Sequence, residues 1–215
     1  AVRLDGNQAS RIFRVAGATV VLDTLTIMNG RDTSGAGGGI YNGGNLTVHR
    51  SALINNSTTG RGGAIFNDTA SRSLVLNQCT VAYNAATNGA GIYNSALSTL
   101  PAVHCTVANN RVPQLGEGGG LYNGQTANLT NSIFCGNTAL VNANVANLGI
   151  INGSSNLVDP FAFLTPLGYY GGPTPTMVPL FGSPAINAGN DATTNAFATD
   201  QRGAGYPRFS RPHVD

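Results

Sequence analysis

The sequence predicts an all-β protein folded as a parallel β-helix, in which the chain coils and each coil pairs with the next. Three observations indicate this fold class. A six-residue motif recurs four times, the segments around it share columns of apolar residues, and glycine and asparagine account for 29 and 25 of the 215 residues. Self-similarity at a period of about 20 to 50 residues is typical of stacked repeat architectures.

The recurring motif predicts one strand of each coil. It reads GGGIYN from residue 37, GGAIFN from 62, GAGIYN from 89 and GGGLYN from 118, so successive copies start 25, 27 and 29 residues apart. Glycine takes the positive φ that a tight bend requires. The apolar residue of each copy should point inward, and the final asparagines should hydrogen-bond along the stack. These residues are Ile40, Ile65, Ile92 and Leu121, followed by Asn42, Asn67, Asn94 and Asn123.

A second repeated segment predicts two more strands. Leu74, Leu76, Cys79 and Val81 stand ten, eight, five and three positions before Asn84. Residues two apart lie on one side of a strand, so each pair marks a short strand, with a bend at the polar residues between them. An antiparallel sandwich also has short strands and glycine turns, but unrelated strands would not share columns. The same columns precede Asn56, Asn110 and Asn137.

The change in composition near residue 160 divides the chain. Residues 1–159 contain the coils, ending in a weaker coil at 138–158, and residues 160–215 hold eight of the ten prolines. Proline cannot donate to a strand ladder, so a proline-rich layer suits the end of one. We expect 160–215 to be an ordered cap of the same structural domain, wrapped over the last coil. The cap would bury its apolar residues, which include Phe161, Phe163, Tyr169, Leu180 and Phe181.

Composition argues against several function classes. All eleven basic residues are arginine, charged residues make up 9% and the net charge is +2, which predicts neither a nucleic-acid footprint nor a polybasic membrane patch. No stretch of 18 apolar residues suggests a transmembrane helix. Ala1 begins inside what resembles a preceding coil, and no signal peptide is visible. His49 and His104 have no further ligand at a metal spacing, so we expect surface histidines, no metal site and no cofactor.

The three cysteines predict buried thiols. Cys79 and Cys105 share an inward column one coil apart, where side chains that point the same way seldom meet the torsion of a disulfide. Cys135 stands in another column.

The repeats and the C-terminal motifs together resemble known families. GGAIFN and the Phe134 to Asn137 segment resemble the GGA[ILV] and FxxN repeats of polymorphic outer-membrane proteins. NLVDP (156–160), GGPTPTMVPL (171–180), GSPAINAG (182–189) and TDQRG (199–203) resemble the end of large bacterial secreted β-helix proteins with a choice-of-anchor Q region. The resemblance implies a right-handed, pectate-lyase-like solenoid, a bacterial extracellular or cell-surface location, and an anchoring role that would belong to the parent protein. Asn187 stands where those proteins usually have Asp.

The aromatic residue of the motif is the candidate ligand-binding feature. It follows the inward column, so strand alternation should turn it outward as a stripe. Stacked aromatics can simply stabilise the sheet. A flat aromatic strip is also a platform on which polysaccharides can lie. The residues are Tyr41, Phe66, Tyr93 and Tyr122.

Parallel β-helices also carry polysaccharide lyases and glycosidases, so a catalytic site has to be considered. Glycoside hydrolysis requires two carboxylates about 5 to 9.5 Å apart. The coils offer few acids, and Arg61, Asp68 and Glu117 form the best alternative set, in which Arg61 and Glu117 share a slot two coils apart. We therefore expect a non-catalytic structural or adhesive module whose partners are polysaccharides or other cell-surface components. The alternative is a carbohydrate-active enzyme.

Overall fold

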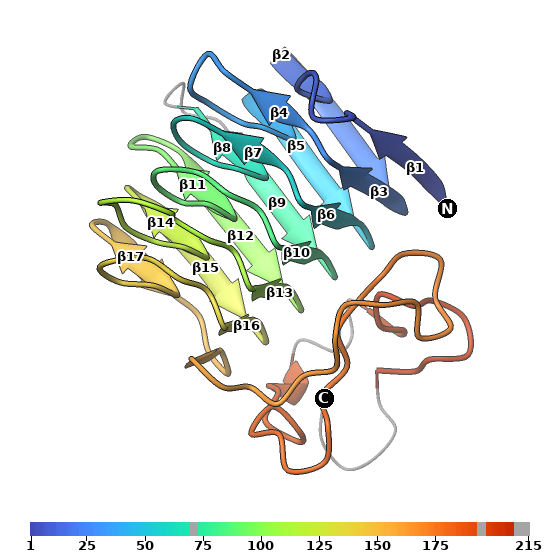
Figure 1. The fold of residues 1–215 in the computed structure, drawn as a ribbon. Coiled ribbons are helices and arrows are strands. Elements are labelled where there is room, and N and C mark those ends of the chain that lie inside the picture. Colours follow the sequence, from blue (N-terminus) through green and yellow to red (C-terminus); the bar gives the residue numbers. More distant parts are fainter. Residues whose placement is uncertain (69–72, 193–196, 209–215) are drawn as a thin grey trace.

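The computed structural model describes residues 1–68, 73–192 and 197–208. These residues form strands and turns without an α-helix, and the named strands pair in parallel. The predicted all-β parallel β-helix is therefore confirmed. Figure 1 shows the strands stacked coil on coil along one axis, with a strand-poor segment at one flank.

Sheet A is the seven-stranded sheet of the stack. Each of its strands is the short segment that precedes a repeated asparagine or its equivalent. In order across the sheet they are β1 (Val2–Asp5), β3 (Leu25–Met28), β6 (Ala52–Ile54), β10 (Thr80–Ala82), β13 (Thr106–Ala108), β16 (Ile133–Cys135) and β19 (Leu157–Asp159).

Sheet B is the ten-stranded sheet and contains two strand rows of the coil. The rows join because β5 (Ile40–His49) runs through both, beside the equally continuous β2 (Phe13–Asp23). On one side of β5 follow β8 (Ile65–Asn67), β11 (Ile92–Asn94), β14 (Leu121–Asn123) and β17 (Val145–Asn147). On the other side follow β9 (Leu74–Asn77), β12 (Thr99–Val103), β15 (Thr126–Thr130) and β18 (Ile150–Asn152).

A minor sheet C closes the remaining side of the coil. It consists of β4 (Arg31–Asp32) and β7 (Ser57–Thr58), and single parallel pairings at Ala85, Arg111 and Thr138 continue it.

The core consists of the predicted columns. The column of Ile27, Leu53, Val81, Val107 and Phe134 pairs in register across sheet A, and each of these side chains is at most 1% exposed. The inward residues of the repeated motif and of the second strand join the same cluster. Cys79 and Cys105 lie in this core as free thiols, as predicted. Cys135, at the end of β16, points to the outer face of sheet A and is buried there beside Ala162 and Met177.

The bends explain why the motif needs glycine. Its first glycine has a positive φ in every copy, for example 69° at Gly37 and 65° at Gly118. A Cβ on Gly37 would stand 2.4 Å from the carbonyl oxygen of Ile40, and one on Gly38 would stand 2.1 Å from that of Ser57. Real side chains do not tolerate such contacts, so neighbouring coils can approach only with glycine here.

Two buried asparagine ladders tie the coils together. The side-chain amide of Asn42 donates to Asn67, Asn67 to Asn94, and Asn94 to Asn123, over 2.7 to 2.8 Å. This confirms the predicted ladder. The asparagines that end the second segment form another ladder, and each also binds backbone groups of the adjacent coil. Its members are Asn56, Asn84, Asn110 and Asn137.

The described part of the 160–215 segment, which we call the tail, lies elsewhere than predicted. It follows the outer face of sheet A and does not cover the last coil (Figure 1). Among the described residues, Ile151 and Val158 continue two core columns yet remain 38% and 53% exposed. Phe161 and Phe181 are also exposed. The expectation of a cap that buries its aromatic residues was therefore wrong, and residues 209–215 lie outside the described residues.

Small residues on sheet A explain this path. Around the inward Val81 and Val107, the outward positions hold only threonine and alanine. A face of short side chains lets a second layer of backbone approach closely. Hydrogen bonds hold the tail there: the Thr80 hydroxyl lies 2.7 Å from the side-chain oxygen of Gln201, and the Thr174 hydroxyl donates to the carbonyl of Arg50 over 2.9 Å.

Candidate functional sites

The four aromatic rings of the repeated motif stack on one another along the outer face of sheet B. We call them the aromatic ladder. Their orientation follows from the parallel register, which places each ring directly beside the equivalent ring of the next coil. The centroid distances are 5.4 Å for Tyr41 and Phe66, 5.5 Å for Phe66 and Tyr93, and 4.5 Å for Tyr93 and Tyr122, with interplanar angles of 29°, 18° and 5°.

Arginines and one carboxylate surround the aromatic ladder. The guanidinium groups of Arg11 and Arg14 lie 5.4 and 5.5 Å from the centroid of the Tyr41 ring, and that of Arg61 lies 5.2 Å from the centroid of Tyr93. These are cation–π distances. The Tyr41 hydroxyl donates a hydrogen bond to the Asp68 carboxylate, and this bond raises the pKa of Tyr41.

The stacking changes what the aromatic ladder can offer a ligand. A platform for sugar rings needs exposed ring faces, but Phe66 and Tyr93 each stack between two neighbouring rings, and guanidinium groups lie over Tyr41. Phe66 and Tyr93 are only 8% exposed. The surface therefore presents ring edges, phenol hydroxyls and cationic groups. The sequence indicated the outward rings and missed the arginines, because Arg11 and Arg14 come from the preceding coil, outside the motif.

The alternative enzyme residues are distributed along the stack. Arg61 and Glu117 do share a column, with Asn88 between them. Glu117 accepts a hydrogen bond of 3.2 Å from Asn142, whereas Asp68 binds Tyr41 at the other end of the aromatic ladder. The two carboxylates thus have different partners in different coils. Among the described residues, no group of three potential metal ligands occurs.

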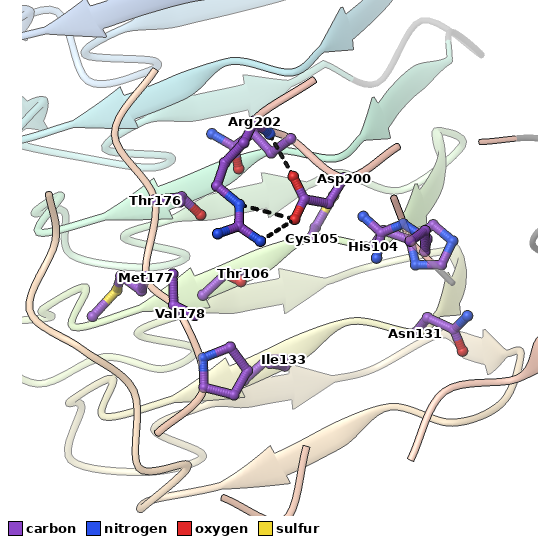
Figure 2. A pocket seen from close by; sticks show the side chains of 13 residues that line it. His104, Cys105, Thr106, Asn131, Ile133, Thr176, Met177, Val178, Asp200 and Arg202 are labelled. Carbon is purple, nitrogen blue, oxygen red and sulfur yellow. Dashed lines mark hydrogen bonds and ion pairs between the residues drawn. The ribbon is translucent and has the colours of Figure 1, made fainter. Parts of the chain in front are cut away.

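A second polar site lies where the tail crosses sheet A (Figure 2). It is a cavity of about 110 Å³ between the β12–β13 bend, sheet A and the tail. Its lining includes His104 and Thr106 from the coils and Asp200, Arg202 and Arg208 from the tail. Nothing in the repeat pattern points to it.

His104 corrects the expectation of ordinary surface histidines. It is 8% exposed, occupies a left-handed bend position with φ 55°, and its ring meets Phe197 edge-on at 5.7 Å. Both ring nitrogens are buried, and neither has a hydrogen-bond partner in the part of the chain that the structure describes. Burial, followed by the positive charge of Arg208, lowers the pKa of His104 to about 3. The imidazole is therefore neutral at ordinary pH.

Comparison with protein families finds a similarity in one segment of the coils. Residues 51–68 match the Chlamydia polymorphic membrane protein repeat. The matched segment contains β6, β7 and β8, and thus the ladder asparagine Asn56, the glycine bend and the Phe66 ring. No curated protein and no solved structure matches the chain. No helix of the described residues is long and apolar enough to cross a membrane.

Proposed function

We propose that this chain is a non-catalytic module of a bacterial cell-surface or secreted protein, serving as a rigid spacer with an adhesive face. The observation that carries the proposal is the match of residues 51–68 to a membrane-protein repeat. The matched segment contains β6, β7 and β8, which pair with strands of the neighbouring coils. Each coil satisfies its polar groups through the next coil, as the asparagine ladders do. Such a stack supports length and stiffness. Secretion and an anchoring role of the choice-of-anchor Q type for the parent protein are parts of this proposal.

The aromatic ladder and its arginines are the proposed adhesive surface. Guanidinium groups bind carboxylates through paired hydrogen bonds, and ring edges favour contact with oxygen atoms because the edge of an aromatic ring is positive. Arg14 lies over the Tyr41 ring and Arg61 over the Tyr93 ring. Successive rings of the ladder come from successive coils, so the ladder repeats with the coil spacing. An extended polysaccharide with regularly spaced carboxylates, such as a polyuronate, fits this pattern better than a neutral glycan that needs exposed ring faces.

A carbohydrate-active enzyme remains the second hypothesis, and the geometry supports it less. The Asp68 carboxylate is occupied by the Tyr41 hydroxyl, and Glu117 contacts Asn142. Neither arrangement provides the opposed pair of carboxylates that glycoside hydrolysis uses.

The test compares polyuronate binding by three proteins. We expect Arg14→Gln combined with Arg61→Gln to weaken binding to polygalacturonate about tenfold, as loss of charge-assisted hydrogen bonds predicts. The control Arg111→Gln removes an equally exposed charge from the sheet C side and should bind as the parent does. Equal binding by all three proteins contradicts the adhesive surface.

Two further measurements address the rest of the proposal. The purified chain should release neither reducing ends nor unsaturated uronates from polysaccharides; turnover that Glu117→Gln abolishes would establish an enzyme. Antibody labelling of intact cells that express the protein tests its location, and label confined to permeabilised cells contradicts the cell-surface proposal.

A further inference from the structure

A cleft of about 360 Å³ lies at the bend that leads from sheet B to sheet A. Three successive coils and the tail line it: Asp23 belongs to the first coil, His49 and Arg50 to the second, Gln78 to the third, and residues 197–199 to the tail. Ligand sites in proteins are typically clefts of about 300 to 1,000 Å³, so this cleft is large enough for a small molecule. It shares no residue with the aromatic ladder or the arginines around it, so the proposed adhesive function does not use it.

The bend holds the side chains of the cleft in fixed positions. Asp23 and His49 pair in register at the ends of β2 and β5. Arg50 and Gln78 occupy the next position of their coils, and both have left-handed backbones with φ of 41° and 56°. The amides of Thr24, Arg50 and Gln78 each donate to a carbonyl of the next coil over 2.9 to 3.0 Å. Hydrogen-bonding side chains thus follow one another at the coil spacing of about 4.8 Å, which is close to the width of a sugar ring.

The charges of the cleft cancel. Arg50 donates to both oxygens of the Asp23 carboxylate, over 3.1 Å from Nε and 2.6 Å from a terminal nitrogen. This hydrogen bonding lowers the pKa of Asp23, so the carboxylate stays ionised beside its guanidinium. Apart from His49, these are the ionisable side chains among the described residues of the lining. A lining without net charge favours an uncharged ligand over an anion or a cation.

The lining also keeps open hydrogen-bonding groups. The ring nitrogens of His49 and the hydroxyl of Thr199 have no hydrogen-bond partner among residues 1–68, 73–192 and 197–208. Gln78 is 3% exposed, and its amide donates to the Thr199 carbonyl, which leaves its side-chain oxygen as an acceptor. The pair with Asp23 uses two of the five guanidinium N–H groups of Arg50. Donors and acceptors therefore lie side by side, as a hydroxyl that both donates and accepts requires.

Phe197 adds an apolar wall to the cleft. It is partly exposed and lines the cleft from the tail side. Its ring meets His104 edge-on, with centroids 5.7 Å apart, so His104 holds the ring and covers at most one of its faces. Clefts that combine an aromatic surface with a few placed polar groups are typical of small-molecule sites. The C–H groups of a sugar ring pack on an aromatic face of this kind.

We propose that this cleft binds one uncharged sugar residue, a pyranose, between the bend side chains and Phe197. Hydroxyl groups of the sugar bind the Asp23–Arg50 pair and His49, while one face of the ring packs on Phe197. The ligand touches the coils and the tail together, so binding also holds the tail against the bend. The proposal does not depend on the adhesive surface, because the two sites share no residue.

The experiment is an NMR titration of the intact chain with three neutral probes and one charged probe. The neutral probes are the methyl glycosides of glucose, galactose and mannose, and the charged probe is glucuronate. We expect at least one glycoside to bind with a Kd on the order of 1 mM, as a ligand of this size allows. Binding should shift the resonances of the Arg50 Nε and the Gln78 side-chain amide. Affinity should change by less than about twofold on addition of salt, because screening acts on charged ligands.

Two results in the parent chain overturn the proposal without any variant. One is that none of the three glycosides shifts the Arg50 and Gln78 resonances at about 100 mM, a hundred times the expected Kd. The other is that the shifts are confined to the aromatic ladder, which would assign the sugar to that surface. Glucuronate that binds about tenfold more tightly than every glycoside contradicts the choice of an uncharged ligand.

Variants separate the cleft from unspecific binding. Asp23→Asn breaks the charged pair, and Phe197→Ala removes the apolar wall; each should weaken binding of the glycoside about tenfold. Asp159→Asn removes the same charge as Asp23→Asn from the last coil, where its side chain accepts from the amide of Phe161, and should bind as the parent does. Binding that both cleft variants leave unchanged indicates an adventitious contact and overturns the proposal.

Discussion

The coils and the tail differ in how far along the chain their contacts reach. Ladder asparagines bind partners one coil away, 24 to 28 residues along the chain in the bonds of Asn123 and Asn56. The tail binds partners that are 121 residues away in the case of Gln201 and Thr80, and 124 in the case of Thr174 and Arg50. A coil therefore repeats contacts that its neighbours also make, whereas each tail contact occurs once. We infer that loss of one ladder residue damages a cooperative stack, and that loss of one tail contact loosens the tail alone.

The largest expected effect comes from breaking a ladder. Asn84→Ala removes the oxygen that accepts from the backbone and the side chain of Asn56, and the amide that donates to the carbonyls of Leu53 and Ala82. Several buried polar groups then lack partners, so we expect a loss of about 3 to 5 kcal/mol in the free energy of unfolding, measured by urea denaturation. The exposed Asn152→Ala should cost less than about 0.5 kcal/mol. Similar costs for both variants would mean that the buried ladder is not what holds the coils.

Acid should weaken the protein through His104, at the junction of the two regions. Its pKa in the folded chain, about 3, lies below the ordinary 6.5, so the unfolded chain binds the proton more tightly. Stability that is fully present above about pH 6.5 is therefore lost as the pH falls toward 3, by about 2 kcal/mol at pH 5. Denaturation of the parent chain and of His104→Asn at pH 7 and pH 5, without added anions, should differ by this amount. Parallel pH profiles would contradict the buried, neutral imidazole.

A smaller and local effect should follow from Gln201→Ala. The Gln201 amide donates to the Thr174 hydroxyl and the Pro175 carbonyl, and its oxygen lies against the Thr80 hydroxyl. We expect the tail to open more readily by about 1.5 kcal/mol, which is roughly a tenfold faster hydrogen exchange at the paired amides of Gly168 and Thr176.

The coil amides provide the internal comparison for that variant. Exchange at β10 and β13 should stay unchanged, as it should everywhere in Gln125→Ala, whose side chain is exposed. Faster exchange throughout the coils in Gln201→Ala would show that the tail and the coils unfold as one unit.

The cysteine thiols should also distinguish the two regions, through the rates at which a thiol reagent labels them. Burial raises the pKa of Cys79 and raises that of Cys135 to about 11, so neither forms the reactive thiolate at neutral pH. Cys79 lies within the coil core, whereas Cys135 lies under the tail with Ala162 and Met177. In Gln201→Ala, a thiol reagent should therefore label Cys135 faster than Cys79. A mass that shows a bridge between Cys79 and Cys105 would contradict the description of both as free thiols.

The two candidate sites differ in the same way as the coils and the tail. The aromatic ladder belongs to the repeated coils, whereas the cavity at His104 needs residues of the tail. The sequence indicated the outward rings because they belong to the repeat, and alternation along a strand is a local rule. It did not indicate that guanidinium groups lie over the rings, because Arg11 stands outside the repeated motif and the slot of Arg61 holds Asn88 and Glu117, and no arginine, in the next two coils. The tail path was predicted wrongly for a related reason. Its aromatic residues argued for burial, whereas the outward Thr80, Ala82, Thr106 and Ala108 were the signal that sheet A, and not the last coil, is the covered surface.

The sequence alone determined the coil: the register of Ile40 with Ile65 and of Asn56 with Asn84 follows from a repeat in which each unit meets a near copy of itself. One pairing rule then applies many times, so errors in a single segment do not change the answer. Only the tertiary structure decided where the tail lies and that His104 is buried beneath it. Those contacts join single residues about one hundred positions apart, and no periodicity in the chain can encode a contact that occurs once.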